Sequence, residues 1–198
     1  QYIMWSIADS PVCPPWIPAA LRAIAEATHD AAQIQKLAAL RVRADSKSPV
    51  LRNEHAFHTL LIRSDEGDPH REAERLFAEN PGDTAIAVTR ALSLHLQGKN
   101  DDALAVTSAL PATELTKPLA AFYHAVFLTA KGDAAKAAPH LAAAEPRVLF
   151  SSEKALLDRA RQIGTEASRA SELKQAVAAD RAQREAAAKA GAENLAAL

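Results

Sequence analysis

Several residue types are scarce in this 198-residue chain, and each scarcity excludes a class of protein. A single cysteine, Cys13, rules out an internal disulfide and a thiolate metal cluster. No run of about 18 apolar residues occurs, so no membrane span is predicted within the chain. Acidic and basic residues nearly cancel, at 24 against 23, which leaves no bulk attraction to nucleic acid or anionic lipid.

Aromatic residues make up only 5% of the chain, and there are only 8 Val and 8 Ile. Sheets favour β-branched and aromatic residues, so this composition argues against a strand-rich fold. Alanine, the best helix former, occurs 47 times. The sequence therefore predicts an all-α protein whose helices pack closely through small side chains.

Helix boundaries are marked along most of the chain. Residues typical of helix N-caps precede apolar periodic segments at Asp30, Ser48, Asp68 and Asp83. Pro49 and Pro69 follow two of these caps at the first helical position, which tolerates proline. The segment 1–14 is predicted to be irregular or extended. We expect an irregular segment plus a degenerate helix pair over 1–49, repeats over 50–146, and a C-terminal helix with an Ala-rich helical tail over 147–198.

Two segments of the chain match each other position by position. Gly98 and Gly132 correspond, and the same shift along the chain relates Ala91 to Ala125, Leu94 to Leu128, and Ala103 to Ala137. The pattern resembles the tetratricopeptide repeat, in which helix, turn and helix recur with this same period of about 34 residues. The resemblance implies a right-handed α-α superhelix, a solenoid of helical hairpins, with a C-terminal capping or projecting helix.

An earlier copy is expected around Leu60, Gly67 and Ala73, although Gly67 lies closer to Gly98 than the repeat period requires. Pro139 falls inside the second helix of the last copy, where a proline removes a hydrogen bond. We expect that helix to start late or to kink. The competing interpretation is an irregular helical bundle with two chance glycine turns.

In the repeat family the first helix of each pair lines a concave, partner-binding groove. Transferred by position, the implied groove residues lie at helical spacing on two helices: Ala85, Val88, Leu92 and His95, then Leu119, Phe122, Val126 and Thr129. The stripe is mostly apolar and lacks the Lys, Arg and Asn with which some members clamp a carboxylate. Two explanations remain open: the stripe binds an apolar or amphipathic segment of a partner, or the chain's own termini cover it.

The tail over 165–198 contains 13 Ala and pairs charged residues at i,i+4, as in Arg181–Glu185. Such a helix forms with little burial. It is expected either to cap the last repeat or to project and pair with a second chain.

No pattern in the chain predicts a catalytic, cofactor or metal site. His55 and His58 are three residues apart, but no further ligand completes a zinc motif. The six glycines are isolated, so no phosphate-binding loop is present, and no Gly-x-Ser-x-Gly motif occurs. Because residue 1 is Gln, we expect a processed form or a piece of a longer polypeptide.

The sequence predicts a non-enzymatic scaffold that binds a protein or peptide partner. Two alternatives remain: a structural homo-oligomer formed through the inner stripe and the C-terminal helix, and an accessory domain of a larger enzyme or membrane-anchored protein.

Overall fold

The computed structural model describes residues 2–8, 10, 12–145 and 149–196, and all its regular structure is helical over that part of the chain. The elements are α1 (Tyr2–Ala8), α2 (Trp16–Ala27), α3 (Ala31–Ala44), α4 (Pro49–Leu61), α5 (Pro69–Glu79), α6 (Thr84–Leu96), α7 (Asn100–Ser108), the 3-10 helix η1 (Glu114–Thr116), α8 (Pro118–Ala130), α9 (Ala134–Ala144) and α10 (Ser151–Ala196). The predicted all-α class is confirmed.

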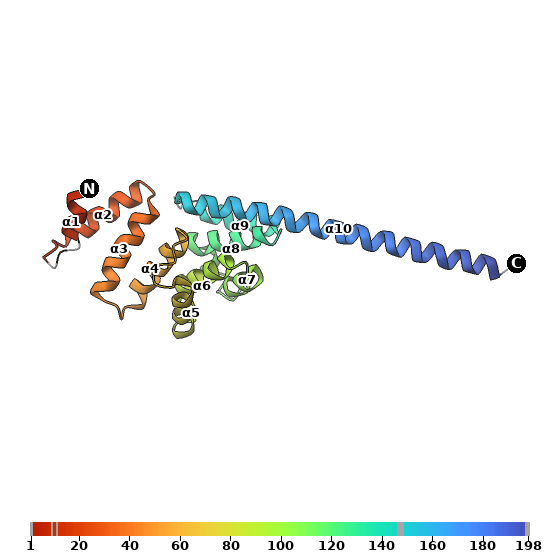
Figure 1. The fold of residues 1–198 in the computed structure, drawn as a ribbon, viewed down its shortest axis with the longest axis horizontal. Helices are drawn as coiled ribbons and strands as arrows, with labels where there is room; N and C mark the ends of the chain where they lie inside the picture. The colour runs from red at the N-terminus through yellow and green to blue at the C-terminus, as the bar shows by residue number, and fades with distance from the viewer. Residues whose placement is uncertain (1, 9, 11, 146–148, 197–198) are drawn as a thin grey trace.

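Helices α2 to α9 form four consecutive hairpins, α2–α3, α4–α5, α6–α7 and α8–α9 (Figure 1). Each helix packs on its neighbours in sequence, and the first helices of the last three hairpins also touch one another, α4 on α6 and α6 on α8. The main core lies between these hairpins. It includes the fully buried Leu92, Tyr123 and Phe127.

The predicted N-caps are confirmed by their hydrogen bonds. The side chains of Ser48, Asp68 and Asp83 accept from the backbone N–H groups of Leu51, Arg71 and Ile86. Asp30 accepts from two backbone N–H groups of α3 and also from the amide side chain of Gln33. These bonds satisfy donors that the first turn of a helix leaves without partners.

One turn recurs at the end of the first helix of every hairpin. The residues in left-handed conformation there are His29, Arg63, Gly98 and Gly132, with φ of 52°, 56°, 79° and 86°. Each donates its backbone N–H to the carbonyl three residues earlier, and the next residue donates to the carbonyl five residues earlier. Each of these turns follows the previous one after about 34 residues, the period of the repeat family. Gly98 and Gly132 are therefore equivalent, and the same turn occurs twice more.

This turn corrects the expected position of the earlier copy. The equivalent of Gly98 is Arg63, whereas Gly67, also left-handed at φ 71°, lies in the longer connection to α5. The sequence comparison missed Arg63 because a glycine was used as the marker. A non-glycine residue adopts this conformation at a steric cost, so its type does not reveal it.

One further expectation is wrong, and one of the two outcomes expected for the helix that contains Pro139 does not occur. Residues 2–8 form the helix α1, whose Met4, Trp5 and Ile7 pack against α2 and α3. The expected irregular structure there neglected this packing. Helix α9 begins at Ala134, directly after Asp133, and continues through Pro139, so it does not start late.

Helix α10 is a single element of 46 residues, in which the expected C-terminal helix continues without a break into the Ala-rich tail. Its first turns pack on α8 and bury Leu156, Leu157 and Ala160. The rest of α10 extends away from the hairpins (Figure 1). Gly164 within α10 is a contact point: a β-carbon there would overlap the carbonyl oxygen of Thr129.

Candidate functional site

The structure buries most of the predicted groove. Side chains of six of the eight residues are buried: Val88, Leu92, His95, Phe122, Val126 and Thr129. Of the first members of the two stripes, Ala85 is exposed and Leu119 is partly buried. The open surface that remains on the first helices therefore lies toward their N-terminal halves.

Helix α10 accounts for part of this burial. Ala155 and Leu156 of α10 share a cavity with Leu61, Leu92 and Leu96, which lie in the C-terminal halves of α4 and α6. The start of α10 thus covers the C-terminal end of the stripe. Coverage by the chain's own C-terminal helix, one of the two explanations left open by the sequence, occurs over these residues.

A buried carboxylate holds α10 in place. Glu153 is fully buried; one of its oxygens accepts from the hydroxyl of Tyr123 at 2.9 Å, and the other from the backbone N–H of Phe150 at 3.0 Å. The bond from Tyr123 joins α10 to α8, whereas the bond from Phe150 is local to the start of α10.

An open groove of about 480 Å³ remains over the N-terminal halves of the first helices. Its apolar lining comes from three of them: Val50 and Phe57 of α4, Ala85 of α6, and Leu119 of α8. Thr89 and His58 also contribute. Val50 is 69% exposed, which is unusual for a large apolar side chain. We call this surface the α4–α8 groove.

Asn53 lines the same groove and is only 8% exposed. Its Oδ1 atom is buried without a hydrogen-bond partner. A buried polar atom in this state costs about 1–3 kcal/mol of stability.

Two arginines form one edge of the groove. Arg22 and Arg41 both bond Glu54, which they shield from solvent, whereas the arginine side chains themselves remain exposed. Partial burial lowers the pKa of Arg22, but hydrogen bonds and charge from Glu54 and Glu26 outweigh it and raise that pKa. The edge is therefore a network of ion pairs in which Arg22 and Arg41 are matched by Glu26 and Glu54.

The histidines considered as metal ligands have other surroundings. His55 contacts the amide of Gln35, and His58 packs edge-on against Phe57 and Phe150. His95 lies within hydrogen-bond distance of the Asn100 side chain, at 2.6 Å, and burial lowers its pKa. Among the residues that the structure describes, no group of three or more His, Cys, Asp or Glu side chains is placed to hold a metal ion.

Sequence reasoning missed the α4 residues of the groove, although a signal for them existed. The offset that separates Arg63 from Gly98 also relates α4 to α6. It pairs Val50 with Ala85, Asn53 with Val88, and Phe57 with Leu92. The predicted stripe included α6 and α8 but not α4, because the irregular position of Gly67 obscured which residues of α4 correspond to those of α6.

Comparison with protein-family models, with curated proteins and with solved structures found no match to this chain. Within the described part of the chain, no helix has both the length and the apolar character needed to cross a bilayer.

Proposed function

We propose that this chain is a non-enzymatic protein-interaction scaffold, a tetratricopeptide-like solenoid that binds a polypeptide segment in the α4–α8 groove. The observation that carries the proposal is the groove itself. It combines exposed apolar side chains with the buried Oδ1 atom of Asn53, which lacks a hydrogen-bond partner, and Arg22 and Arg41 form one edge.

The repeated turn supports the solenoid. Four equivalent turns, each following the last after about 34 residues, give each hairpin the same local geometry. Equivalent units that each contact their neighbours stack in one direction, and stacked first helices provide a continuous surface. The contacts of α4 with α6, and of α6 with α8, are of this kind.

The energetics favour a ligand with an apolar side chain. Burying a side chain such as Val or Leu contributes roughly 1.5–3 kcal/mol. Val50, Phe57 and Leu119 supply apolar surface for such a side chain. An amphipathic helix or an extended peptide meets this requirement.

The test is a selection of phage-displayed peptides on the whole chain. Selected peptides are then compared for binding to Val50→Glu and Ala85→Arg, two changes at partly or fully exposed positions of the groove. We expect each change to weaken binding at least about tenfold, measured by fluorescence anisotropy.

A matched control is Ile3→Glu, which alters an exposed apolar residue of α1 that lies outside the groove. It should leave peptide binding unchanged. The proposal fails if no peptide is selected, or if the selected peptides bind the groove variants as tightly as the unaltered chain while circular dichroism shows that the variants are folded.

A further inference from the structure

A cavity of about 480 Å³ lies between the first turns of α10 and the C-terminal ends of α4 and α6. It has no described lining residue in common with the α4–α8 groove. Most of its lining is apolar, from Leu61, Ile62, Leu92, Leu96, Ala155 and Leu156. Small-molecule sites are cavities of about 300–1,000 Å³ with mostly apolar walls and a few polar groups. We call this space the α10 cavity.

The charge in the lining of the α10 cavity has one sign. Arg63 is the one charged residue among the described residues that line it. Within the described part of the chain, Arg63 forms no ion pair. The acidic residue of the first turn of α10, Glu153, accepts hydrogen bonds from Tyr123 and from the backbone of Phe150 and does not line the cavity. The guanidinium of Arg63 is therefore available to an anion.

The first turn of α10 adds hydrogen-bond donors on the same side. Ser151 and Ser152 begin this helix, and both line the cavity. The Oγ atom of Ser152 is buried without a hydrogen-bond partner, and such an atom costs stability until it is bonded. The N-terminal end of a helix also stabilises negative charge, because its first N–H groups have no partner within the helix. A guanidinium, a hydroxyl and a helix N-terminus favour the same ligand group, an anion.

We propose that the α10 cavity binds a carboxylic acid with an apolar chain, a fatty acid of medium length. The chain lies between the leucines of α4, α6 and α10, and the carboxylate lies beside Arg63 and Ser152. Burial of the chain provides most of the affinity, and a guanidinium bonds a carboxylate with two parallel N–H donors. The site is separate from the α4–α8 groove, so this inference goes beyond the proposed function.

A series of ligands tests the apolar part of the site. The straight-chain carboxylates from hexanoate to dodecanoate are titrated into the whole chain by calorimetry, each below its micelle concentration. Each added methylene should tighten binding about fourfold. The gain should stop within the series, once the chain fills the cavity. Decanoate should bind as one molecule per chain, and about tenfold more tightly than decanol, which has no charge to pair with Arg63.

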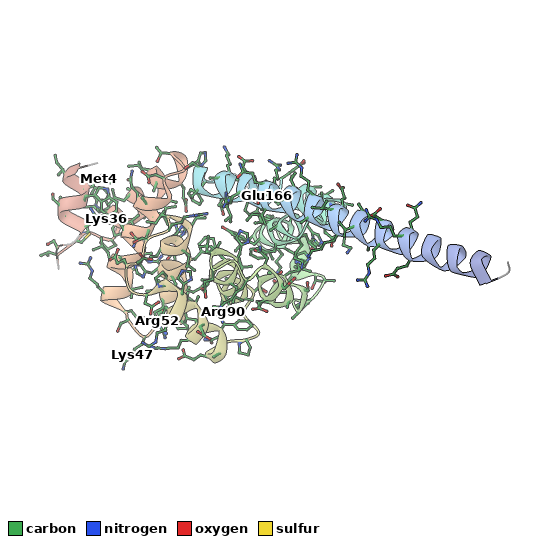
Figure 2. The ribbon with its side chains drawn as sticks, turned by 45° about the vertical axis from the view of Figure 1, so that its right-hand side comes forward. Met4, Lys36, Lys47, Arg52, Arg90 and Glu166 are labelled. Atoms are coloured by element: carbon green, nitrogen blue, oxygen red, sulfur yellow. The ribbon has the colours of Figure 1, made fainter. Side chains whose placement is uncertain are left out.

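Substitutions test the position of the site. Ala155→Trp changes an exposed residue of the lining and fills the cavity, so it should weaken decanoate binding at least about tenfold. The matched control, Ala170→Trp, makes the same change at an exposed position of α10 and should leave binding unaltered. Ala170 lies beyond Glu166, which Figure 2 labels near the point where α10 continues away from the other helices.

A third variant, Arg63→Gln, tests the choice of an anion. It should weaken decanoate binding about tenfold and leave decanol binding unchanged. Equal effects on the two ligands would overturn the assignment of an anionic ligand.

Three other results would overturn the inference. They are no saturable binding of decanoate, an affinity that still rises at dodecanoate, and undiminished binding to Ala155→Trp that circular dichroism shows to be folded. If Ala155→Trp does not fold, the ligand series and Arg63→Gln still decide. Peptides selected on phage that bind equally well with decanoate present leave the proposed function standing whatever the outcome here.

Discussion

At residue scale, the recurring turn contains one left-handed position in each hairpin. The type of residue at that position affects the free energy of unfolding. A residue with a β-carbon costs roughly 1–2 kcal/mol in the left-handed conformation, and glycine avoids this cost. Arg63 holds the same turn as Gly98, and a β-carbon at Gly98 would meet no atom within 4 Å. The stability cost of a β-carbon at these positions therefore comes from the backbone angle alone.

We predict opposite effects from exchanging these residues. Arg63→Gly should raise the free energy of unfolding by about 1 kcal/mol, and Gly98→Ala should lower it by about the same amount. Urea unfolding followed by circular dichroism measures both. A loss of stability in Arg63→Gly would show that the arginine side chain matters more than the turn.

Gly164 and Gly82 form a second matched pair. A β-carbon at Gly164 would overlap the backbone of Thr129, whereas one at Gly82 would lie in open space. We expect Gly164→Ala to destabilise the chain by about 1–3 kcal/mol through overpacking, and Gly82→Ala to change stability by no more than about 0.5 kcal/mol. Equal unfolding midpoints for the two variants would contradict the close packing of α10 on α8.

At element scale, the hydrogen bond between Tyr123 and Glu153 couples α10 to α8. Tyr123→Phe removes the hydroxyl and leaves a fully buried carboxylate with one fewer donor. The loss should be about 1.5–3 kcal/mol, the range for bonds to charged groups. The measurement is urea unfolding, with the exposed change Gln175→Ala on the free part of α10 as a control that should be neutral. An unchanged midpoint in Tyr123→Phe would show that the bond does not stabilise the docked helix.

Three helices meet at His124 of α8. Its Nδ1 lies 2.9 Å from the hydroxyl of Thr107 on α7, and its ring packs edge-on against His140 of α9. Burial first, and the charge of His140 second, lower the pKa of His124 to about 4. The unfolded chain therefore binds more protons than the folded chain between this pKa and the ordinary value of about 6.5.

Stability should accordingly fall as pH decreases from about 6.5 toward 4. His124→Gln removes one contributor, so its unfolding midpoint in urea should depend less steeply on pH over this interval. His55 and His95, whose pKa values burial also lowers, add to the slope that remains. Identical slopes in the variant and the unaltered chain would contradict this role for His124.

At the scale of the whole molecule, the features that the sequence predicted are helix boundaries and turns, which depend on residues close together in the chain. Capping side chains such as Ser48 and Asp83 act within one turn, and glycine marks a left-handed turn, so most boundaries from α3 to α9 were predictable. The groove was predictable only in part. Ala85 and Leu119 line the groove, but the other six residues of the predicted stripe are buried by packing between helices distant in sequence.

A left-handed turn residue was predictable only where it is a glycine. Arg63 adopts the same turn as Gly98, but its residue type does not indicate that conformation. The contact of Gly164 with Thr129 joins helices distant in sequence, so no local pattern indicates it.

The unbroken length of α10 determines how the molecule moves in solution. At about 1.5 Å per residue its 46 residues span about 70 Å, whereas a compact fold of this size has a radius of gyration of about 16 Å. Small-angle scattering extrapolated to zero concentration should give a clearly larger radius, and truncation after residue 168 should restore a compact value. An elongated particle tumbles slowly end over end and quickly about its long axis, so N–H bonds along α10 should relax differently from those in the hairpins.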